Sequence, residues 1–343
     1  MDSQKKPGRA ARPGTGGITL NDVAKLAGVS AITVSRALNT PAAVSPDTLE
    51  RVRGAITRSG YVPNLVAGGL ASNRSRLVAA LVPTIAGPVF LETIQALTDA
   101  LAEAGCQLML GQSGYGGARE DALLDAIIGR RPDGIVLIGI MHSIEGRRRL
   151  LASGIPVVET WDITPTPLDM IVGFSHEKVG VAVADYLHGR GFRRPGIVSA
   201  SDERATRRRV GFEQRFAELG VPGIPACVVP SPSSLGNGRA GFAELRASHP
   251  GIDVVFCSSD VIAHGVITEA HATGLSVPDD IAVMGFGDLP FAAFTYPQLS
   301  TVRIDGTSIG RQAARFILDR VERRDVGPPV RDIGFFLVQR GSA

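Results

Sequence analysis

The sequence predicts two folds in one chain: a small all-α helix-turn-helix headpiece, followed by a larger α/β core with parallel sheets. Three observations support this. Apolar residues between positions 19 and 60 recur at helical spacing, with glycines at the expected helix ends. From Leu77 onward, short apolar runs alternate with amphipathic stretches. Cations are concentrated in the head, so we expect the two parts to have different partners.

Composition excludes several classes of protein. The chain has 343 residues, of which 44% are hydrophobic and 20% charged, which is typical of a globular protein with two or three domains. Its three cysteines show no C-x-x-C spacing, which argues against a disulfide framework, a zinc ribbon and a redox pair. No apolar run approaches the roughly 18 residues of a membrane span, and the basic start lacks the apolar core of a secretory signal. We therefore expect a cytoplasmic protein without a membrane partner.

Charge differs between the two parts. Residues 1–76 hold 11 Lys and Arg against 4 Asp and Glu, whereas the remainder is net negative. A cationic head on a mildly acidic body favours a polyanionic partner for the head. Residues 1–17, which we predict to be a disordered basic tail, hold four of these cations, and a tail that only aids solubility would explain that part of the excess.

The headpiece, residues 18–62, is expected to contain three helices. Thr19 is the predicted N-cap of the first, and Gly28 ends it. Ser30 caps a second helix, which places Val34, Ala37 and Leu38 inward and Ala31, Ile32, Ser35 and Arg36 outward. The third begins at Ser45 and Pro46, closes the small core with Leu49, Val52 and Ile56, and ends at Gly60. The first two helices and their glycine-containing turn indicate a helix-turn-helix.

Three stretches carry a family resemblance: LNDVAKLAGVSAITVSRALN, VSPDTLERV and GYVPNLVAGGLA. Together they resemble the DNA-binding headpiece and hinge of the lactose-repressor (LacI/GalR) family, and the resemblance continues through essentially the whole chain after the tail. It implies a sequence-specific transcriptional regulator, most simply a repressor, that binds double-stranded operator DNA as a homodimer. It also implies control by a small-molecule effector, with no cofactor and no enzymatic activity. The chain ends shortly after its last predicted strand, so we expect a dimer rather than a tetramer.

The resemblance also assigns DNA-binding positions. Arg36 has the fork geometry that recognises guanine in the major groove, and Ile32 can contact only thymine methyls or exclude a mismatched base. Ala31 and Ile32 occupy the family positions that vary with operator sequence. The remaining positions, in the headpiece and at the start of the hinge, are expected to contact the DNA backbone or to seat the helices: Leu20, Ser30, Thr33, Ser35, Asn39, Ser45 and Asn64. Ser30 and Ser45 can equally be helix caps alone.

The hinge, residues 63–76, forms a helix in the family only on the operator. Leu70 falls on the position of the leucine that wedges into the minor groove, with Ala67 and Ala71 beside it. Gly68 and Gly69 are unfavourable in a helix by about 1 kcal/mol each relative to alanine. Ordering of this hinge is therefore expected to depend strongly on DNA.

The core, residues 77–343, resembles the two-lobed periplasmic-binding-protein-like core of the same family. The predicted strands lie in LVAALVP, CQLMLGQ, DGIVLIG, IPVVET, GIVSA, VVFCSSD and IAVMGFGD. The resemblance implies an N-lobe of about 77–174 and 304–331, and a C-lobe of about 175–303 and 332–343. Ligands of open α/β sheets bind outside the carboxyl ends of the strands, so the effector is expected between the lobes.

The sequence contains no recognisable catalytic or metal site. GQSGYGG after a strand is neither G-x-G-x-x-G nor a Walker motif, and the six histidines include no H-E-x-x-H. His264 and His271 share a helix face but lack a third ligand. No G-x-S-x-G nucleophile motif is present. A sugar-processing enzyme that acquired a DNA-binding head is the second hypothesis.

Effector-binding residues follow from the resemblance. Arg208, three residues before Gly211, matches the family's effector-binding arginine, and Asp162 matches its first-lobe acid. Trp161 is the only tryptophan of the chain and stacks or packs beside Asp162. The other predicted members of this site are Thr84, Phe90, His142, Arg204, Ser259, Asp260 and Gly287.

One departure favours an anionic effector. Sugar-binding relatives carry G-[YF]-D-D where this chain has Gly285-Phe286-Gly287-Asp288, so a carboxylate is missing. A pocket with an arginine and one carboxylate fewer suits an anion. IPVVETWD, LDMIVGF and DVVFCSSD resemble the gluconate-operon repressor subgroup, which implies a sugar acid such as gluconate. The alternative is the same regulator with a neutral sugar or a purine as effector.

Overall fold

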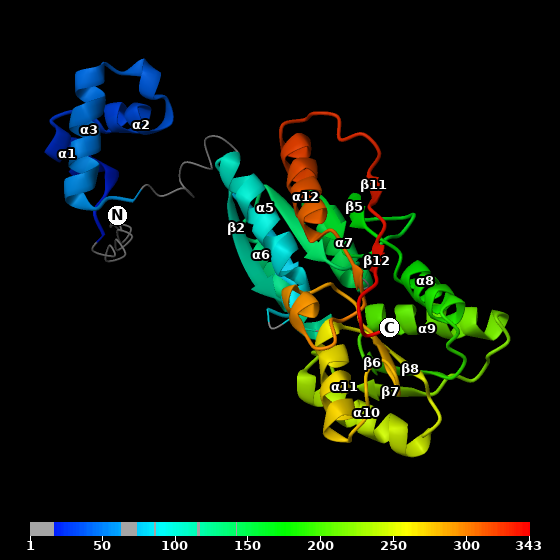
Figure 1. The fold of residues 1–343 in the computed structure, drawn as a ribbon. Coiled ribbons are helices and arrows are strands. Elements are labelled where there is room, and N and C mark those ends of the chain that lie inside the picture. Colours follow the sequence, from blue (N-terminus) through cyan, green and yellow to red (C-terminus); the bar gives the residue numbers. More distant parts are fainter. Residues whose placement is uncertain (1–16, 63–73, 86, 115–116, 142) are drawn as a thin grey trace, which may run out of the picture. The chain divides into compact units, whose positions relative to one another are not determined.

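The computed structural model describes residues 17–62, 74–85, 87–114, 117–141 and 143–343, and it divides into two compact units at residue 74 (Figure 1). The tail to residue 16, the hinge positions Asn64, Ala67, Leu70 and Ala71, and His142 lie outside the described residues. The predictions on these positions stay predictions.

The headpiece is a three-helix unit, as the caps predict. Its helices are α1 (Leu20–Ala27), α2 (Ala31–Asn39) and α3 (Pro46–Ser59), with a short 3-10 turn at Pro41–Ala43. Thr19 and Asp22 form a reciprocal capping box, and Gly28 takes the left-handed conformation, with φ of 63°, that ends α1. The buried core is small: Val23, Ala24, Ala27, Val34, Ala37, Val52 and Ala55.

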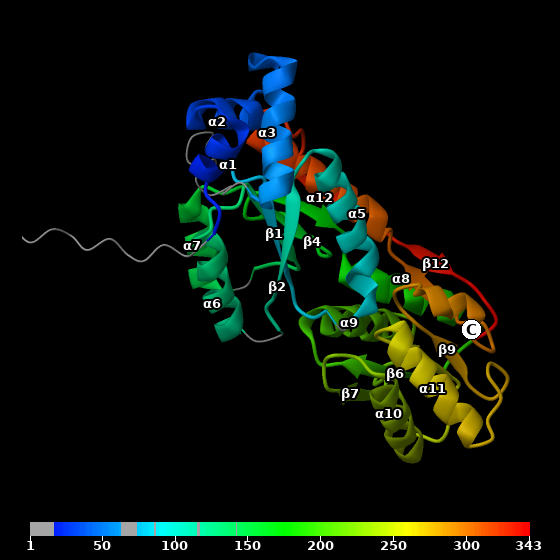
Figure 2. The same ribbon diagram turned by 90° about the vertical axis from the view of Figure 1, so that its left-hand side faces the viewer.

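The first lobe of the core contains a six-stranded parallel sheet in the order β11-β5-β4-β3-β1-β2. Its strands are β1 (Leu77–Val82), β2 (Gln107–Gln112), β3 (Gly134–Ile138), β4 (Val157–Thr160), β5 (Met170–Gly173) and β11 (Val330–Asp332). Helices α5 (Leu91–Glu103) and α12 (Gly306–Val321) cover one face, and α6 (Gly117–Ile128) and α7 (Ile144–Ser153) cover the other (Figure 2).

Strand alternation explains why this sheet is apolar throughout. Val78, Ala80 and Val82 of β1 pack with α5 and α12, whereas Ala79 and Leu81 pack with α6 and α7. Both faces are therefore buried, as expected for a parallel sheet with crossover helices.

The second lobe has a four-stranded parallel sheet in the order β7-β6-β8-β9. The strands are β6 (Pro195–Ala200), β7 (Ala226–Val229), β8 (Val254–Cys257) and β9 (Ala282–Met284), and the helices are α8 (His176–Gly189), α9 (Glu203–Glu218), α10 (Leu235–Ser248) and α11 (Asp260–Ala272). A short antiparallel pair joins β10 (Thr301–Arg303) to β12 (Phe336–Val338). The predicted alternation of strands and helices is confirmed. The predicted strands did not include β5, β7, β10, β11 or β12.

Two glycines bring α8 and α9 together. A Cβ on Gly180 would collide with the Arg208 carbonyl oxygen, and one on Gly211 would collide with the Glu177 carbonyl oxygen. Because α8 begins with His176 and α9 carries Arg208, this close packing fixes two side chains of the site described below. None of the helices in the described part of the chain combines the length and hydropathy needed to cross a bilayer.

Candidate functional site

A cavity lies between the carboxyl ends of the two core sheets. The first lobe contributes Gly87–Phe90 and Trp161, and the segments that follow β6, β7, β8 and β9 contribute most of the remaining wall. Its volume is about 80 Å³, below the roughly 300–1,000 Å³ usual for small-molecule sites. A ligand of hexose size therefore requires the lobes to separate or the lining side chains to move.

Arg208 is the buried cation of this cavity, with 5% of its surface exposed. Its Nη1 donates to His176 Nδ1 at 2.8 Å, and its Nη2 donates to the Ser258 carbonyl oxygen at 2.9 Å. The guanidinium carbon lies 3.8 Å from the centre of the Phe286 ring. Its Nε is buried without a hydrogen-bond partner, and no described carboxylate lies within 4.0 Å of the guanidinium. Burial lowers the pKa of Arg208 to about 10, so it carries its charge at neutral pH.

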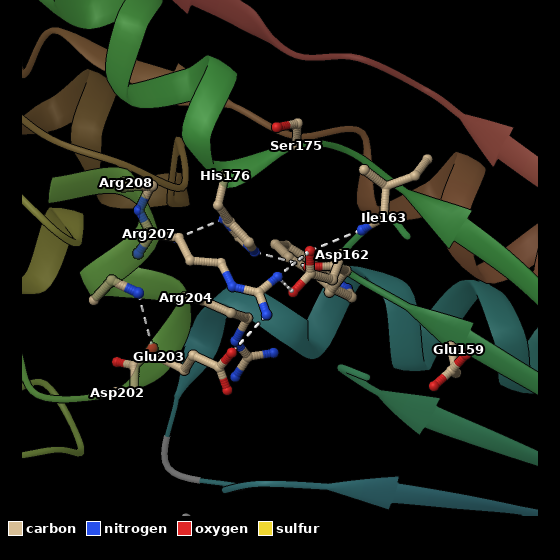
Figure 3. A network of polar contacts seen from close by, with 12 residues as sticks. Glu159, Asp162, Ile163, Ser175, His176, Asp202, Glu203, Arg204, Arg207 and Arg208 are labelled. Carbon is tan, nitrogen blue, oxygen red and sulfur yellow. Dashed lines mark hydrogen bonds and ion pairs between the residues drawn. The ribbon is translucent and has the colours of Figure 1, made fainter. Parts of the chain in front are cut away.

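His176, the first residue of α8, binds Arg208 (Figure 3). Its Nε2 lies 2.9 Å from the Trp161 carbonyl oxygen. Burial and the charge of Arg208 keep the pKa of His176 well below its ordinary value, so the ring is neutral. An arginine can only donate, so Nδ1 is the acceptor and Nε2 carries the proton.

Two further arginines of α9 have different partners. Arg207 Nη1 binds both carboxylate oxygens of Asp162 at 3.2 and 3.1 Å, and Nη2 binds Glu203 at 2.5 Å. Arg204 lies over the Phe90 ring, 4.9 Å from its centre. Burial raises the pKa of Asp162, partly offset by the Ile163 N–H and the charge of Arg207. Asp162 thus forms an ion pair with Arg207 and does not line the cavity (Figure 3).

The predicted effector residues divide into two groups. Phe90, Trp161, Arg204, Arg208 and Ser259 line the cavity, whereas Thr84, Asp162, Asp260 and Gly287 do not.

Asp260 is a structural acceptor in this conformation. It is fully buried, and it accepts from the Leu289 N–H at 2.7 Å and the Thr301 hydroxyl at 2.5 Å. Burial raises its pKa to about 6. Gly287 has a φ of 127°, which disfavours any side chain there; a Cβ would lie 3.3 Å from Val89.

The sequence analysis missed several lining residues: His176, Asp202, Ser258 and Phe286. Three of them stand directly after a parallel strand or within two residues of one, where ligand-binding side chains gather. Asp202 also caps α9, accepting from the Ala205 N–H at 3.1 Å. With His176 neutral, Arg204 and Arg208 against Asp202 give the described lining one net positive charge.

The headpiece presents a mostly polar strip on α2. Ile32 is 67% exposed, and Arg36 and Asn39 are exposed on the same side of the helix. Ser30 and Ser45 are helix caps, accepting from the Thr33 and Thr48 N–H groups. Ala31 and Ser35 are half-buried rather than fully outward, and Leu20 and Thr33 are also half-buried.

These two units define a class of protein: a DNA-binding regulator with a ligand-binding core. Residues 19–64 match the family model "Bacterial regulatory proteins, lacI family", and residues 184–343 match a periplasmic binding protein-like domain. The chain is 39% identical over 331 residues to the HTH-type transcriptional regulator GntR of Pseudomonas aeruginosa, covering 96% of each chain.

Solved structures agree with this class of protein. A LacI-family regulator from Silicibacter pomeroyi has 32% identity and a TM-score of 0.89, with 95% of this chain and 99% of that chain covered. The lac repressor dimer bound to operator and the anti-inducer ONPF has 22% identity and a TM-score of 0.83 over 95% and 99% of the two chains, which shows a shared fold. The chain belongs to the LacI family of transcriptional regulators; the enzyme hypothesis is wrong.

Proposed function

We propose that this regulator is a dimeric repressor of operator DNA, controlled by a sugar acid such as gluconate in the cleft between the lobes. The proposed effector class rests on one observation, the environment of Arg208. Its guanidinium is buried and protonated, its Nε–H has no acceptor, and no described carboxylate lies within ion-pair distance.

An anion would complete the environment of Arg208. Burying a charge without a counter-charge costs several kcal/mol, and an unsatisfied buried donor costs about 1–3 kcal/mol more. A carboxylate placed against Nε removes both costs, while a neutral sugar removes only the second. The net positive charge of the lining supports the same choice.

The described side chains suggest a division of roles. Arg208 takes the carboxylate of the sugar acid, Arg204 stands near it, and Asp202 accepts hydroxyl groups. Asp162 is paired with Arg207 in this conformation and does not line the cavity. The likeness of the core sequence to the gluconate-operon repressor subgroup supports gluconate or a close relative as the ligand.

On the DNA side, Arg36 is proposed to read a guanine and Ile32 to meet thymine methyls, because both are exposed on one face of α2. Ser30 and Ser45, besides capping their helices, are proposed to contact phosphates. The lobes are proposed to comprise 77–174 with 304–331, and 175–303 with 332–343.

A ligand panel tests the effector. Gluconate, 2-ketogluconate, 5-ketogluconate, idonate, galactonate and glucose are compared by thermal shift, and those that bind are measured by calorimetry. A ligand that binds only the folded state adds about 2.7 kcal/mol at a hundred times its Kd. We expect one of the acids to bind and glucose not to bind. Binding of glucose without any acid would contradict the charge argument and favour a neutral effector.

A further inference from the structure

A series of hydrogen bonds leads away from Arg208, with the covalent structure of Trp161 as one link, from its carbonyl group to its indole ring. His176 Nε2 reaches the Trp161 carbonyl oxygen at 2.9 Å, and Trp161 Nε1 donates to Thr93 Oγ1 at 3.0 Å. Thr93 Oγ1 then donates to the Gly306 carbonyl oxygen at 3.0 Å. Every member of this series is buried in the described structure or belongs to a buried backbone group.

Donors and acceptors in this series of hydrogen bonds can be assigned in only one way. Arginine and the indole N–H only donate, and a carbonyl oxygen only accepts. Arg208 must therefore donate to His176, and His176 must donate to Trp161. A protonated His176 would lose its acceptor atom and place a second positive charge 2.8 Å from Arg208. The neutral Nε2–H form is the one that joins the two residues.

His176 has little freedom to leave this position. Its ring is 2% exposed and packs edge-on against Phe174, with the ring centres 4.7 Å apart. The first turn of α8 is held against α9 by the close approach at Gly211. Trp161, its other partner, has a φ of 61°, so the backbone there is constrained as well.

The series of hydrogen bonds also connects the two lobes of the core. Arg208 belongs to α9 and is tied to the segment after β8 through Ser258, whereas Trp161 follows β4. Thr93 belongs to α5, and Gly306 begins α12. A change in the position of the Arg208 guanidinium therefore reaches two first-lobe helices through three side chains.

We propose that His176 is a positioning residue: it orients Arg208 toward the anionic effector and transmits occupancy of the cleft through Trp161 to α5 and α12. The proposal rests on the proposed function for the identity of the ligand. The hydrogen bonds themselves do not depend on it. A purely structural histidine would instead affect stability and leave the ligand response unchanged.

Trp161 emission provides the readout, because Trp161 is the only tryptophan in the sequence and takes part in the series of hydrogen bonds. The full-length protein is titrated with gluconate, with calorimetry for affinity and Trp161 emission for the response. His176→Phe keeps an aromatic ring against Phe174 but can neither accept from Arg208 nor donate to Trp161. His176→Gln retains one donor and one acceptor. His188→Phe, on the same helix but outside the cavity lining, is the matched control.

We expect His176→Phe to weaken gluconate binding at least tenfold and to reduce the change in Trp161 emission at saturating gluconate to the part that comes from direct contact of the ligand with Trp161. His176→Gln should recover part of both, and His188→Phe should behave as the wild type. Wild-type affinity and emission change in His176→Phe, with only a lower Tm, would overturn the proposal.

Two further outcomes distinguish failure of the sugar-acid effector from failure of the proposed role of His176. If glucose binds and gluconate does not, the sugar-acid effector is wrong, and the same emission titration with glucose decides the role of His176. If neither binds, ¹⁵N NMR of the histidine rings in the ligand-free protein at pH 7 decides it. A neutral Nε2–H His176 whose Nδ1 signal changes in Arg208→Gln supports this series of hydrogen bonds; a protonated ring or the Nδ1–H form overturns it.

Discussion

Arg36 of α2 and Arg208 of the cleft, which we propose to bind DNA and the effector, are held in opposite ways. Arg36 is exposed on α2, and the polar side chains near it are satisfied by local bonds, such as Asn39 to Ser35. Arg208 is held by His176, Ser258 and Phe286, which lie 32 to 78 positions away in sequence. We propose that Arg36 is ordered by DNA, whereas Arg208 is ordered by the fold and lacks a counter-charge and a hydrogen-bond partner for Nε.

The same contrast exists between neighbours on α9. Arg207 has two carboxylate partners, Asp162 and Glu203, so its charge is already compensated. Arg208 differs by one position and is directed into the protein, where its partners are neutral. Charge counting along the sequence cannot separate these two arginines; only the direction of each side chain does.

The largest effect is expected where the fold orders Arg208. Gly180→Ala places a Cβ against the Arg208 carbonyl oxygen and should force α8 and α9 apart, with a loss of about 3 kcal/mol in the free energy of unfolding. Gly189→Ala, on the same helix with open space around it, is the control and should be neutral or stabilising by up to about 1 kcal/mol. Urea unfolding followed by Trp161 emission measures both.

Equal stabilities of the two glycine variants would show that the packing of α8 on α9 does not fix Arg208, and the contrast with the headpiece would fail.

A smaller effect is expected in the headpiece. Arg36→Ala should cost roughly 1–3 kcal/mol of binding free energy on the operator and much less on random DNA, because one bidentate base contact is lost while phosphate contacts remain. Titration of both DNAs at one fixed salt concentration measures the difference. The stability of the headpiece should not change, since Arg36 is exposed. Equal losses on the two DNAs would mean that Arg36 contacts only the backbone.

The sequence predicted most of the fold because its signals are local. The caps at Thr19, Ser30 and Ser45 and the glycine ends of α1 and α3 depend on residues within one helical turn. The alternation of buried strands and amphipathic helices is equally local. β5 and β7 were missed although they are as long as β4 and β8. β5 follows β4 without an intervening helix, and β7 is an edge strand in which only every second residue is buried.

The site was less predictable because its contacts are distant in sequence. The family resemblance identified Arg208 and Trp161, but it did not show that Arg207 takes Asp162 or that His176 holds Arg208. Asp260 looked like a lining residue because it follows β8; in the structure its carboxylate is used by Leu289 and Thr301. Side-chain direction depends on tertiary packing, which spacing along the chain does not contain.

The central claim is that an anion held by Arg208 controls DNA binding. The most direct measurement is operator affinity with and without saturating gluconate for the wild type, Arg208→Gln and Arg209→Gln, a neighbour paired with Glu213. We predict that gluconate weakens operator binding of the wild type and of Arg209→Gln by the 1–3 kcal/mol typical of allosteric coupling, roughly 5- to 150-fold. Arg208→Gln should bind the operator as the wild type does, but without any response to gluconate. A full response in Arg208→Gln would contradict the account.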